Sequence, residues 1–398
     1  MLYSFNECCV HELNVIVETS PRPLVKARRT GRPRVHTVQA IWLGLIFAVL
    51  LPFITSPAFG QNDAIRACDL AAASPSDNAR PSAIAGVAFD KVNSANAVAA
   101  CQSAIGVSSN TPRLMYELGR AFDVGKNNEQ ALIWYRKAAD QRYAAAQYNL
   151  GVMYSNGQGV PQDYAVAISW YRKAADQGNV LAQQGLGNSY LNGQGVPQDY
   201  AAAVPWLRKA ADQGDADSQA KLGAVYYAGL GVAKDYATAA SWFLRAANQG
   251  DDNSQYLLGE MYREGRGVPQ NYPVAVDWYR KAAGQGDADA EFHLGEMYNQ
   301  GHGVPQDYVA AVQWFRKAAN QGNYEAQAGL GLLYAEGQGV PQNFVQAYMW
   351  LDLASANLPL SDTKLRSGAI KLRDHVASLM TPAELAEAQS LAAAWTRK

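Results

Sequence analysis

The feature that most constrains this chain is a Leu-Gly pair that recurs every 36 residues. A constant period of this kind predicts a stack of similar units, because one short unit cannot bury its own apolar face. Tryptophans keep the same interval from Trp134 to Trp350, and an earlier unit with a loop shorter by four residues begins at Leu118. The six regular pairs are Leu150-Gly151, Leu186-Gly187, Leu222-Gly223, Leu258-Gly259, Leu294-Gly295 and Leu330-Gly331.

Each unit predicts two short helices joined by a turn, as residues 179–214 illustrate. Asn179 is a typical N-cap, and apolar residues follow at helical spacing around Leu186. An interior Gly costs up to about 1 kcal/mol relative to Ala, so the recurring Gly187 predicts close contact between helices. Gly193 predicts a left-handed end to the first helix, and Asp199 predicts the cap of the second. Asp215, Asp251, Asp287 and Asn323 occupy the same position as Asn179 in later units.

Two prolines test the helical interpretation. Pro273 falls at the start of a second helix, where proline is tolerated. Pro205 falls deeper, directly before Trp206. Because proline lacks an amide hydrogen and crowds the preceding turn, Pro205 predicts a kink or a delayed start.

The repeated motif is A-x-x-x-L-G-x-x-Y-x-x-G-x-G-V-P-Q-D-Y-x-x-A-x-x-W-Y-R-K-A-A-x-Q-G. It resembles the Sel-one-like repeat (SLR) family, a relation of the tetratricopeptide repeat, over residues 111–357. The resemblance implies an all-α, right-handed α-solenoid of seven tandem helical hairpins, with a concave face that binds proteins. Residues 61–110 are predicted to form an N-terminal helical cap, and residues 358–398 to form C-terminal capping helices.

The first sixty residues have the order of an export signal. Basic residues from Arg28 to Arg34 precede an apolar run over residues 40–54, and small residues follow at Ala58 and Gly60. This order predicts cleavage near Gly60 and a periplasmic or secreted protein. The run is shorter than the roughly twenty residues of a spanning helix, although an uncleaved membrane anchor is the alternative. Cys8 and Cys9 precede the signal, and our hypothesis is a later start at Val35 or Val38.

Two cysteines remain after the predicted cleavage site, Cys68 and Cys101. A pair of cysteines in an exported chain predicts a disulfide, with two buried free thiols as the alternative. No further Cys or His lies at metal-ligand spacing from them, so neither a metal nor another cofactor is expected.

Charge and motifs give little sign of chemistry. The formal net charge of −1 does not favour a nucleic-acid or anionic-membrane partner. Ser361-Asp362-Thr363-Lys364 and Ser76-Asp77-Asn78 match two parts of the serine β-lactamase signature, but in the wrong order and without K-T-G. His293 and His302 each occur in one unit and are interpreted as surface residues. We therefore predict a protein that is not an enzyme, with a β-lactam- or peptidoglycan-acting or -binding envelope protein as the alternative.

The partner is expected to be a protein or peptide, bound by a monomeric adaptor or regulator. Positions two before, two after and five after the repeat Leu lie opposite the apolar stripe at 100° per residue. Aromatic and Arg side chains there are typical binding anchors, although some must pack against the preceding hairpin. The predicted partner-binding residues are Tyr148, Tyr227, Tyr256, Glu260, Arg263, Phe292, Glu296 and Asn299.

Overall fold

The computed structural model describes residues 57–358 and 363–395. Within these ranges the chain forms eighteen α-helices and one short 3-10 helix, with no strand. Cys8, Cys9 and the apolar run of the predicted export signal lie outside the described residues. Among the described helices, none combines the length and apolar character that a bilayer crossing requires. The chain divides into two compact units, which meet between Gln198 and Asp199 in the sequence.

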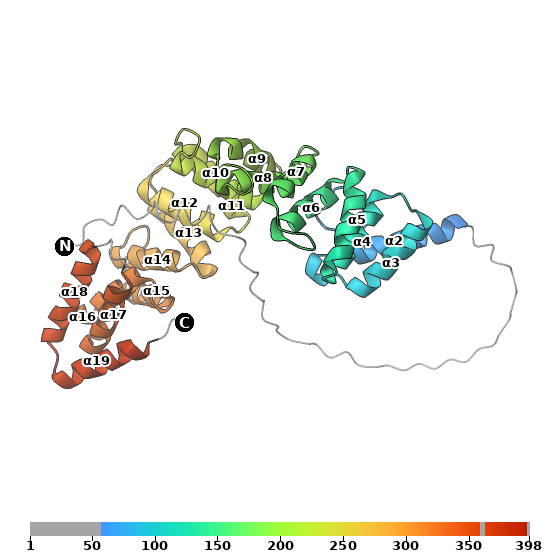
Figure 1. Cartoon of the computed structure of the whole chain (residues 1–398). Helices are drawn as coiled ribbons and strands as arrows, with labels where there is room; N and C mark the ends of the chain where they lie inside the picture. The colour runs from blue at the N-terminus through green and yellow to red at the C-terminus, as the bar shows by residue number, and fades with distance from the viewer. Residues whose placement is uncertain (1–56, 359–362, 396–398) are drawn as a thin grey trace, which may run out of the picture. The chain divides into compact units, whose positions relative to one another are not determined.

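The first unit contains the N-terminal cap and the first repeats (Figure 1). Within this unit, the second helix of a repeat packs against the first helix of its own repeat and against that of the next, as in a solenoid. Its elements are α2 (Pro57–Ala72), η1 (Phe89–Lys91), α3 (Ser94–Val107), α4 (Pro112–Val124), α5 (Asn128–Asp140), α6 (Ala144–Asn156), α7 (Tyr164–Ala175) and α8 (Val180–Asn192).

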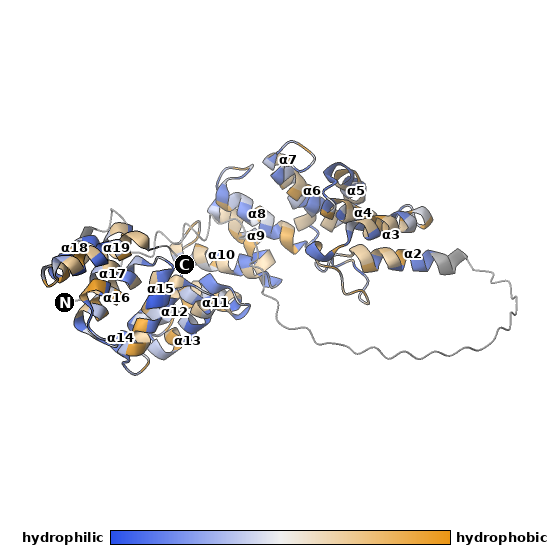
Figure 2. Ribbon diagram, turned by 90° about the horizontal axis from the view of Figure 1, so that it is seen from below, coloured by the Kyte–Doolittle hydropathy of each residue, from blue (hydrophilic) through white to orange (hydrophobic). Residues whose placement is uncertain are grey.

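The second unit continues the pattern and ends in the C-terminal cap. Hydrophobic and hydrophilic residues follow one another along its helices, as Figure 2 shows. They are α9 (Tyr200–Asp212), α10 (Ala216–Ala228), α11 (Tyr236–Asn248), α12 (Asp252–Glu264), α13 (Tyr272–Gly284), α14 (Ala288–Gln300), α15 (Tyr308–Asn320), α16 (Tyr324–Glu336), α17 (Phe344–Asn357), α18 (Thr363–Ser378) and α19 (Pro382–Ala394). The predicted all-α solenoid class is confirmed.

The predicted caps and turns are confirmed. The side chain of Asn179 accepts a hydrogen bond from the amide of Ala182, and Asp251 does the same for Ser254. Asp215, Asp287 and Asn323 cap their helices in the same way. Gly193 takes a φ of 68°, a left-handed value that favours glycine.

The glycine of the repeated Leu-Gly pair lies against an aromatic ring of the second helix. A Cβ atom on Gly259 would lie 2.5 Å from the ring of Tyr279, and one on Gly295 would lie 2.4 Å from that of Phe315. The predicted close helix contact is therefore confirmed, because no side chain fits there. The same crowding against a ring occurs at Gly119, Gly151 and Gly223, whereas a Cβ on Gly331 would lie 2.7 Å from the Leu351 side chain.

The constant spacing of the motif also ties successive repeats together. Arg172 on α7 donates to the Tyr190 hydroxyl on α8 at 2.7 Å, and Arg280 on α13 donates to Tyr298 on α14 at 2.9 Å. The adjacent lysine lies over the tryptophan of its own helix, as with Lys281, whose Nζ is 3.5 Å from the ring centre of Trp278. The W-Y-R-K segment thus serves the scaffold.

Pro205 does not delay its helix. The helix α9 begins at Tyr200, the same register position at which α7 and α11 begin, so the predicted late start is wrong. Pro205 lies inside α9 at an exposed position. Pro273 lies in the first turn of α13, as predicted.

Both ends of the repeat array are covered by helices. At the N-terminal end, α2, α3 and α4 pack together around the Cys68–Cys101 disulfide, which confirms the predicted pairing. At the C-terminal end, α17 packs with α18 and α19. The helix α19 begins with a reciprocal capping box between Thr381 and Glu384.

Candidate partner-binding site

Seven of the eight predicted partner-binding residues lie in the second unit, on the first helices α10, α12 and α14. Tyr148 lies in the first unit on α6, where its ring packs 5.7 Å from that of Tyr171. Asn299 is half-buried near the end of α14. The other six include four buried side chains, Tyr227, Tyr256, Glu260 and Phe292, and two half-buried ones, Arg263 and Glu296.

Glu260 and Arg263 form the centre of the site. The Arg263 guanidinium donates to both carboxylate oxygens of Glu260, at 2.9 and 2.6 Å, and to Glu264 at 3.0 Å. The Tyr279 hydroxyl also donates to Glu260. Burial alone would raise the pKa of Glu260, but His293 and Arg263 outweigh it and hold this pKa at about 2. Glu260 is therefore an ionised carboxylate with most of its acceptor capacity used.

His293 joins Glu260 on α12 to Glu296 on its own helix. Its Nδ1 lies 3.0 Å from Oε2 of Glu296, and its Nε2 lies 3.5 Å from Oε1 of Glu260. The imidazole stacks on the Tyr279 ring, with a centroid distance of 5.3 Å. Burial alone would lower the pKa of His293, but the two carboxylates raise it to about 9, so the ring is charged at neutral pH.

A second arginine extends this arrangement towards α10. Arg266 lies just after α12, and its Nε is 2.6 Å from Oε2 of Glu264. Its Nη1 donates to the Tyr227 hydroxyl at 2.6 Å. We call the connected set the α12–α14 network; it balances three carboxylates with three cations. Its members are Tyr227, Arg266, Glu264, Arg263, Glu260, Tyr279, His293 and Glu296.

Parts of the network reach the surface, while two predicted aromatic residues beside it are buried. The side chains of Arg266 and Glu296 are 30% and 26% exposed. Tyr256 and Phe292 are only 9% exposed, and Phe292 packs against the Phe315 ring in the hydrophobic core. Their prediction as contact residues stays a prediction, and the network side chains Arg266 and Glu296 that reach the surface are charged.

The interpretation of His293 as a surface residue is wrong. Its imidazole is largely covered and belongs to the network, whereas His302 is half-buried against the Tyr272 ring at 4.8 Å. Tyr279, Glu264 and Arg266 were also not predicted. A usable signal was present, because Glu260 and Glu296 share one register position and His293 precedes the second by one helical turn.

Of the two β-lactamase-like strings, Ser76-Asp77-Asn78 lies within the described residues. Asp77 is buried, accepts a hydrogen bond from the Tyr143 hydroxyl and caps the amide of Ala79. Ser361 and Asp362 lie outside the described residues. Within the described part of the chain, one group of three potential metal ligands was found, Cys68, Cys101 and Glu117, and two of these form the disulfide.

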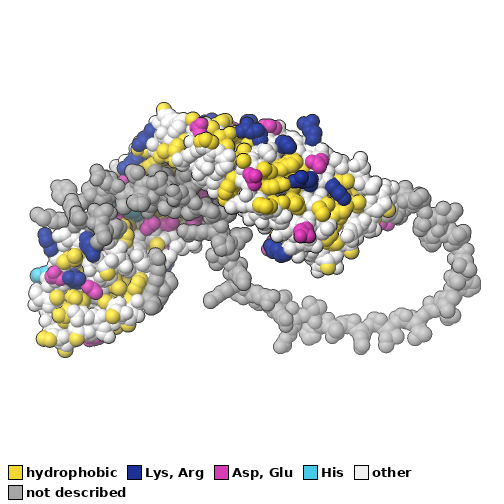
Figure 3. Space-filling view, viewed as in Figure 1, with side chains coloured by type: hydrophobic (Ala, Val, Ile, Leu, Met, Phe, Trp, Pro, Cys, Tyr) yellow, Lys and Arg dark blue, Asp and Glu magenta, His cyan; other side chains and the backbone are white. Residues whose placement is uncertain are grey.

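Figure 3 shows the charged side chains on one face of the described residues. On the face shown in Figure 3, basic and acidic side chains are interspersed among hydrophobic ones. The full chain has a formal net charge of −1.

Comparison with known proteins identifies the repeat. The Sel1 repeat family model matches residues 99–143, 144–179, 180–215, 216–251, 252–287, 288–323 and 325–357. A crystal structure of a Sel1 repeat protein from Oxalobacter formigenes is 34% identical with a TM-score of 0.52; the match covers 60% of this chain and 96% of that one. A protective antigen of uropathogenic Escherichia coli with an SLR fold is 30% identical with a TM-score of 0.36, over 75% and 78% of the two chains. No curated protein gives a significant match.

Proposed function

Because this chain belongs to the Sel1 repeat family, whose members are generally protein–protein interaction modules, we propose that it is an exported scaffold that binds a protein or peptide partner. The proposed contact surface is the first-helix face of the second unit, around the α12–α14 network. The role that fits is an adaptor or regulator without catalytic activity.

The observation that carries this proposal is the continuity of the network across three successive first helices. It runs from Tyr227 on α10 through Arg263 on α12 to Glu296 on α14. Charges held in place by several partners are pre-organised, so a ligand that matches them loses little entropy on ordering them. Fixed charges of both signs favour a partner with complementary charges at a set spacing.

The repeats use different residues for packing and for the proposed contact surface. Motif residues such as Arg280, Lys281 and Trp278 are used in contacts between and within repeats. The network residues differ from repeat to repeat, as Lys221 and His293 illustrate at one register position. Variation on a constant frame is how repeat proteins distinguish partners.

Site-specific photo-crosslinking tests the surface. A benzoylphenylalanine placed at Asn299, beside the network, should yield one defined adduct in the producing cell. The matched control is the same residue at Gln313, exposed on the second helix α15. Adding Arg266→Ala to the Asn299 variant should reduce the adduct several-fold. Equal adducts from both positions, or adducts from Gln313 alone, would contradict the proposed surface.

Export is a separate part of the proposal. The charged flank, short apolar run and small residues up to Gly60 support it, and so does the disulfide, since disulfides persist in oxidising compartments. The helix α2 begins at Pro57, so cleavage after Gly60 removes one turn and keeps Cys68. The mass of the protein recovered from the periplasm or medium should correspond to a chain starting at Gln61 or Phe59. Recovery of the intact chain in the membrane fraction would favour the anchored alternative.

A further inference from the structure

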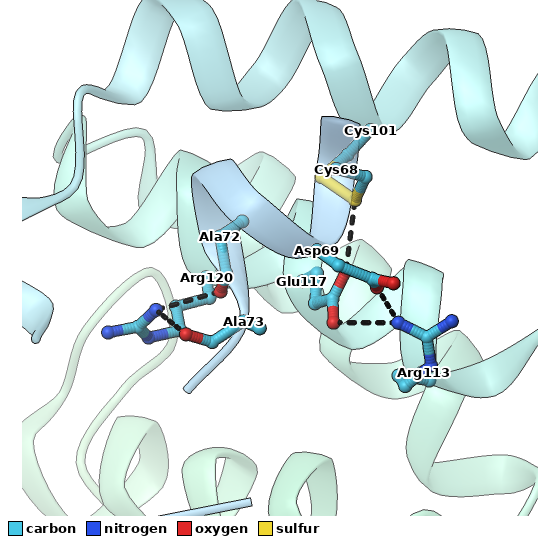
Figure 4. The surroundings of a disulfide bond; sticks show 8 residues. All are labelled: Cys68, Asp69, Ala72, Ala73, Cys101, Arg113, Glu117 and Arg120. Carbon is cyan, nitrogen blue, oxygen red and sulfur yellow. Dashed lines mark hydrogen bonds and ion pairs between the residues drawn. A yellow bond between two sulfur atoms is a disulfide. The ribbon is translucent and has the colours of Figure 1, made fainter. Parts of the chain in front are cut away.

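A carboxyl group lies directly against the disulfide of the N-terminal cap. Glu117 on α4 has 0% of its surface exposed, and its Oε2 lies 3.0 Å from Sγ of Cys68 (Figure 4). The sulfur atoms of Cys68 and Cys101 and this carboxyl oxygen all lie within 4.8 Å of one another. The three groups come from α2, α3 and α4, so the contact exists only when the cap has assembled.

Which group can donate a hydrogen bond between Glu117 and Cys68 depends on whether the cysteines are oxidised or reduced. A disulfide sulfur carries no hydrogen, so Oε2 of Glu117 has a satisfactory contact with Cys68 only if the carboxyl group is protonated and donates. In the reduced protein the relation is reversed, because a Cys68 thiol can donate to an ionised Glu117. One proton therefore lies on Glu117 when the Cys68–Cys101 disulfide is formed and on Cys68 when it is reduced.

The cations near Glu117 are largely committed elsewhere. Nη1 of Arg113 lies 3.2 Å from Oε1 of Glu117, but the same nitrogen pairs with Asp69. Arg120 donates to the backbone carbonyls of Ala72 and Ala73, at 2.7 and 3.1 Å, and to that of Val87. Glu117 thus has half of one ion pair, which is weak compensation for a fully buried carboxylate.

The surrounding titratable groups agree with this count. Burial is the main cause that raises the pKa of Glu117, Asp77 adds to it, and Arg113 and Arg120 oppose it; the result is about 7. Asp69 faces the site from α2, and burial raises the pKa of Tyr116 to about 12 and that of Tyr143 further, so both stay neutral. Glu117 therefore can hold or release a proton near neutral pH.

We propose that Glu117 is the proton acceptor when the Cys68–Cys101 disulfide forms and the proton donor when it opens. A small disulfide oxidant, R–S–S–R, first reacts with Cys101 to give a mixed disulfide and one R–SH. The Cys68 thiol then passes its proton to Glu117, and the thiolate attacks Sγ of Cys101. The mixed disulfide breaks, and R–S⁻ leaves and takes one proton from solvent, while Glu117 keeps the proton of Cys68. Two thiols, R–S–S–R, the ionised Glu117 and one solvent proton thus become one disulfide, two R–SH and the protonated Glu117.

The assignment of the two cysteines follows from the geometry. The 3.0 Å contact is to Cys68, so this thiol loses its proton to Glu117, and Cys101 is the sulfur that is attacked. Both cysteines are fully buried in the finished cap. The step therefore belongs to the docking of α2 onto α3 and α4, after the oxidant has reached Cys101. Proton transfer by a positioned carboxyl group typically accelerates a reaction about 10²- to 10⁴-fold.

Reoxidation kinetics test the proposal on the full chain carrying Cys8→Ser and Cys9→Ser, so that no other thiol reacts. The reduced protein is treated with oxidised glutathione from pH 5 to 9, and the closed form is counted by thiol alkylation and mass spectrometry. We expect the rate of formation of the Cys68–Cys101 disulfide to rise with pH and to reach a plateau near pH 7. Glu117→Gln should close at least about 10-fold more slowly at pH 7, with a rate that rises only towards the ordinary thiol pKa of about 8.5.

A matched control separates the proton from the ion pair. Asp69→Asn removes the other partner of Arg113 but leaves Glu117 beside Cys68, so its closure at pH 7 should stay within a few-fold of the parent. An equal rate and pH profile for the parent and Glu117→Gln would overturn the proposal.

Infrared spectroscopy of the parent gives a readout that does not depend on the glutamine variant folding. The oxidised protein at pH 6 should show a buried carboxylic-acid carbonyl band, and reduction by a phosphine should convert it to a carboxylate band. No change in that band on reduction would contradict the proposed proton transfer. This inference does not rest on the proposed partner, so either can fail alone.

Discussion

Glu117, which lies against the disulfide of the N-terminal cap, and Glu260 in the second unit are both buried carboxyl groups on first helices, yet their pKa values move in opposite directions. Glu260 receives two donors of Arg263 and the Tyr279 hydroxyl and faces His293, and its pKa is about 2. Glu117 shares one nitrogen of Arg113 with Asp69, and its pKa is raised to about 7 by burial. The number of committed donors, rather than burial itself, decides whether the charge is kept.

The two regions also show what the repeat leaves variable. Glu117 directly precedes Leu118, and His293 directly precedes Leu294, so the two residues occupy the same register position. The same place on the first helix therefore holds an acid beside a disulfide in the cap and a base between two carboxylates in the second unit. The backbone is constant, and the electrostatics of each site depend on its local partners.

The largest effect is expected when the well-paired carboxylate is neutralised. Glu260→Gln leaves Arg263 and His293 covered without their main counter-ion, and breaking a buried pair costs about 3–5 kcal/mol of unfolding free energy. Urea unfolding at pH 7 measures this loss. The control is Asp277→Asn, because Asp277 pairs with Arg280 but its side chain is 70% exposed. That change should cost less than about 1 kcal/mol, and similar losses in both variants would refute the contrast.

Neutralising the poorly paired carboxylate of Glu117 should raise the free energy of unfolding instead of lowering it. The folded pKa of Glu117 is raised from 4.5 to about 7, so its stabilising contribution is complete below pH 4.5 and is lost as pH rises through 7. Glu117→Gln mimics the protonated acid and should be more stable than the parent at pH 8 by up to about 3 kcal/mol. The two proteins should be nearly equal at pH 4.5. Urea unfolding of both proteins at both pH values tests this. The same change in unfolding free energy between pH 4.5 and pH 8 in the parent and in the variant would contradict it.

A smaller change should come from the outer carboxylate of the network. Glu296→Gln removes one of the two carboxylates beside His293. We expect the pKa of His293 to fall from about 9 by about one unit, which corresponds to about 1.4 kcal/mol. Because this pKa is raised when folded, its stabilising contribution is present below pH 6.5 and is lost as pH rises through the folded value. NMR titration of the imidazole measures the shift, and an unchanged pKa would show that Glu260 alone holds the charge.

The repeat residues made most of the fold predictable. The period gave the hairpins, and the caps at Asn179 and Asp251, the crowded glycines and the Cys68–Cys101 bond all follow from local rules. The site was predicted less well. The angular position of a residue on its own helix does not show which neighbouring helices cover it. The helix α12 packs against both α13 and α14, so Glu260 is buried although it lies opposite the apolar stripe.

His293 could not be predicted from the repeat pattern for a related reason. A residue that occurs in one unit carries no periodic signal, and its partner Glu260 lies in the preceding repeat. The contact depends on how far α12 and α14 are apart, which the sequence alone does not specify. Long-range polar pairs therefore need the packed structure, whereas caps and turns do not.

The smallest expected effect concerns the turn that closes the first repeat. Arg142 takes a φ of 62°, where the corresponding turns of the later repeats use glycines such as Gly250 and Gly286, at 97° and 93°. A left-handed conformation costs an ordinary L-residue about 1 kcal/mol, and glycine loses more freedom on folding, so Arg142→Gly should stabilise the chain by about 0.5 kcal/mol.

Gly286→Ala is the matched reverse experiment, because a Cβ at this position would meet no atom within 4 Å and only backbone strain is added. This variant should therefore lower the unfolding free energy by about 1 kcal/mol. Thermal unfolding of both variants, at one pH, gives shifts of opposite sign if backbone conformation sets the difference between the turns. If both variants lose stability, the Arg142 side chain makes a contact that outweighs the strain, and the irregular first turn is then stabilised by its side chain.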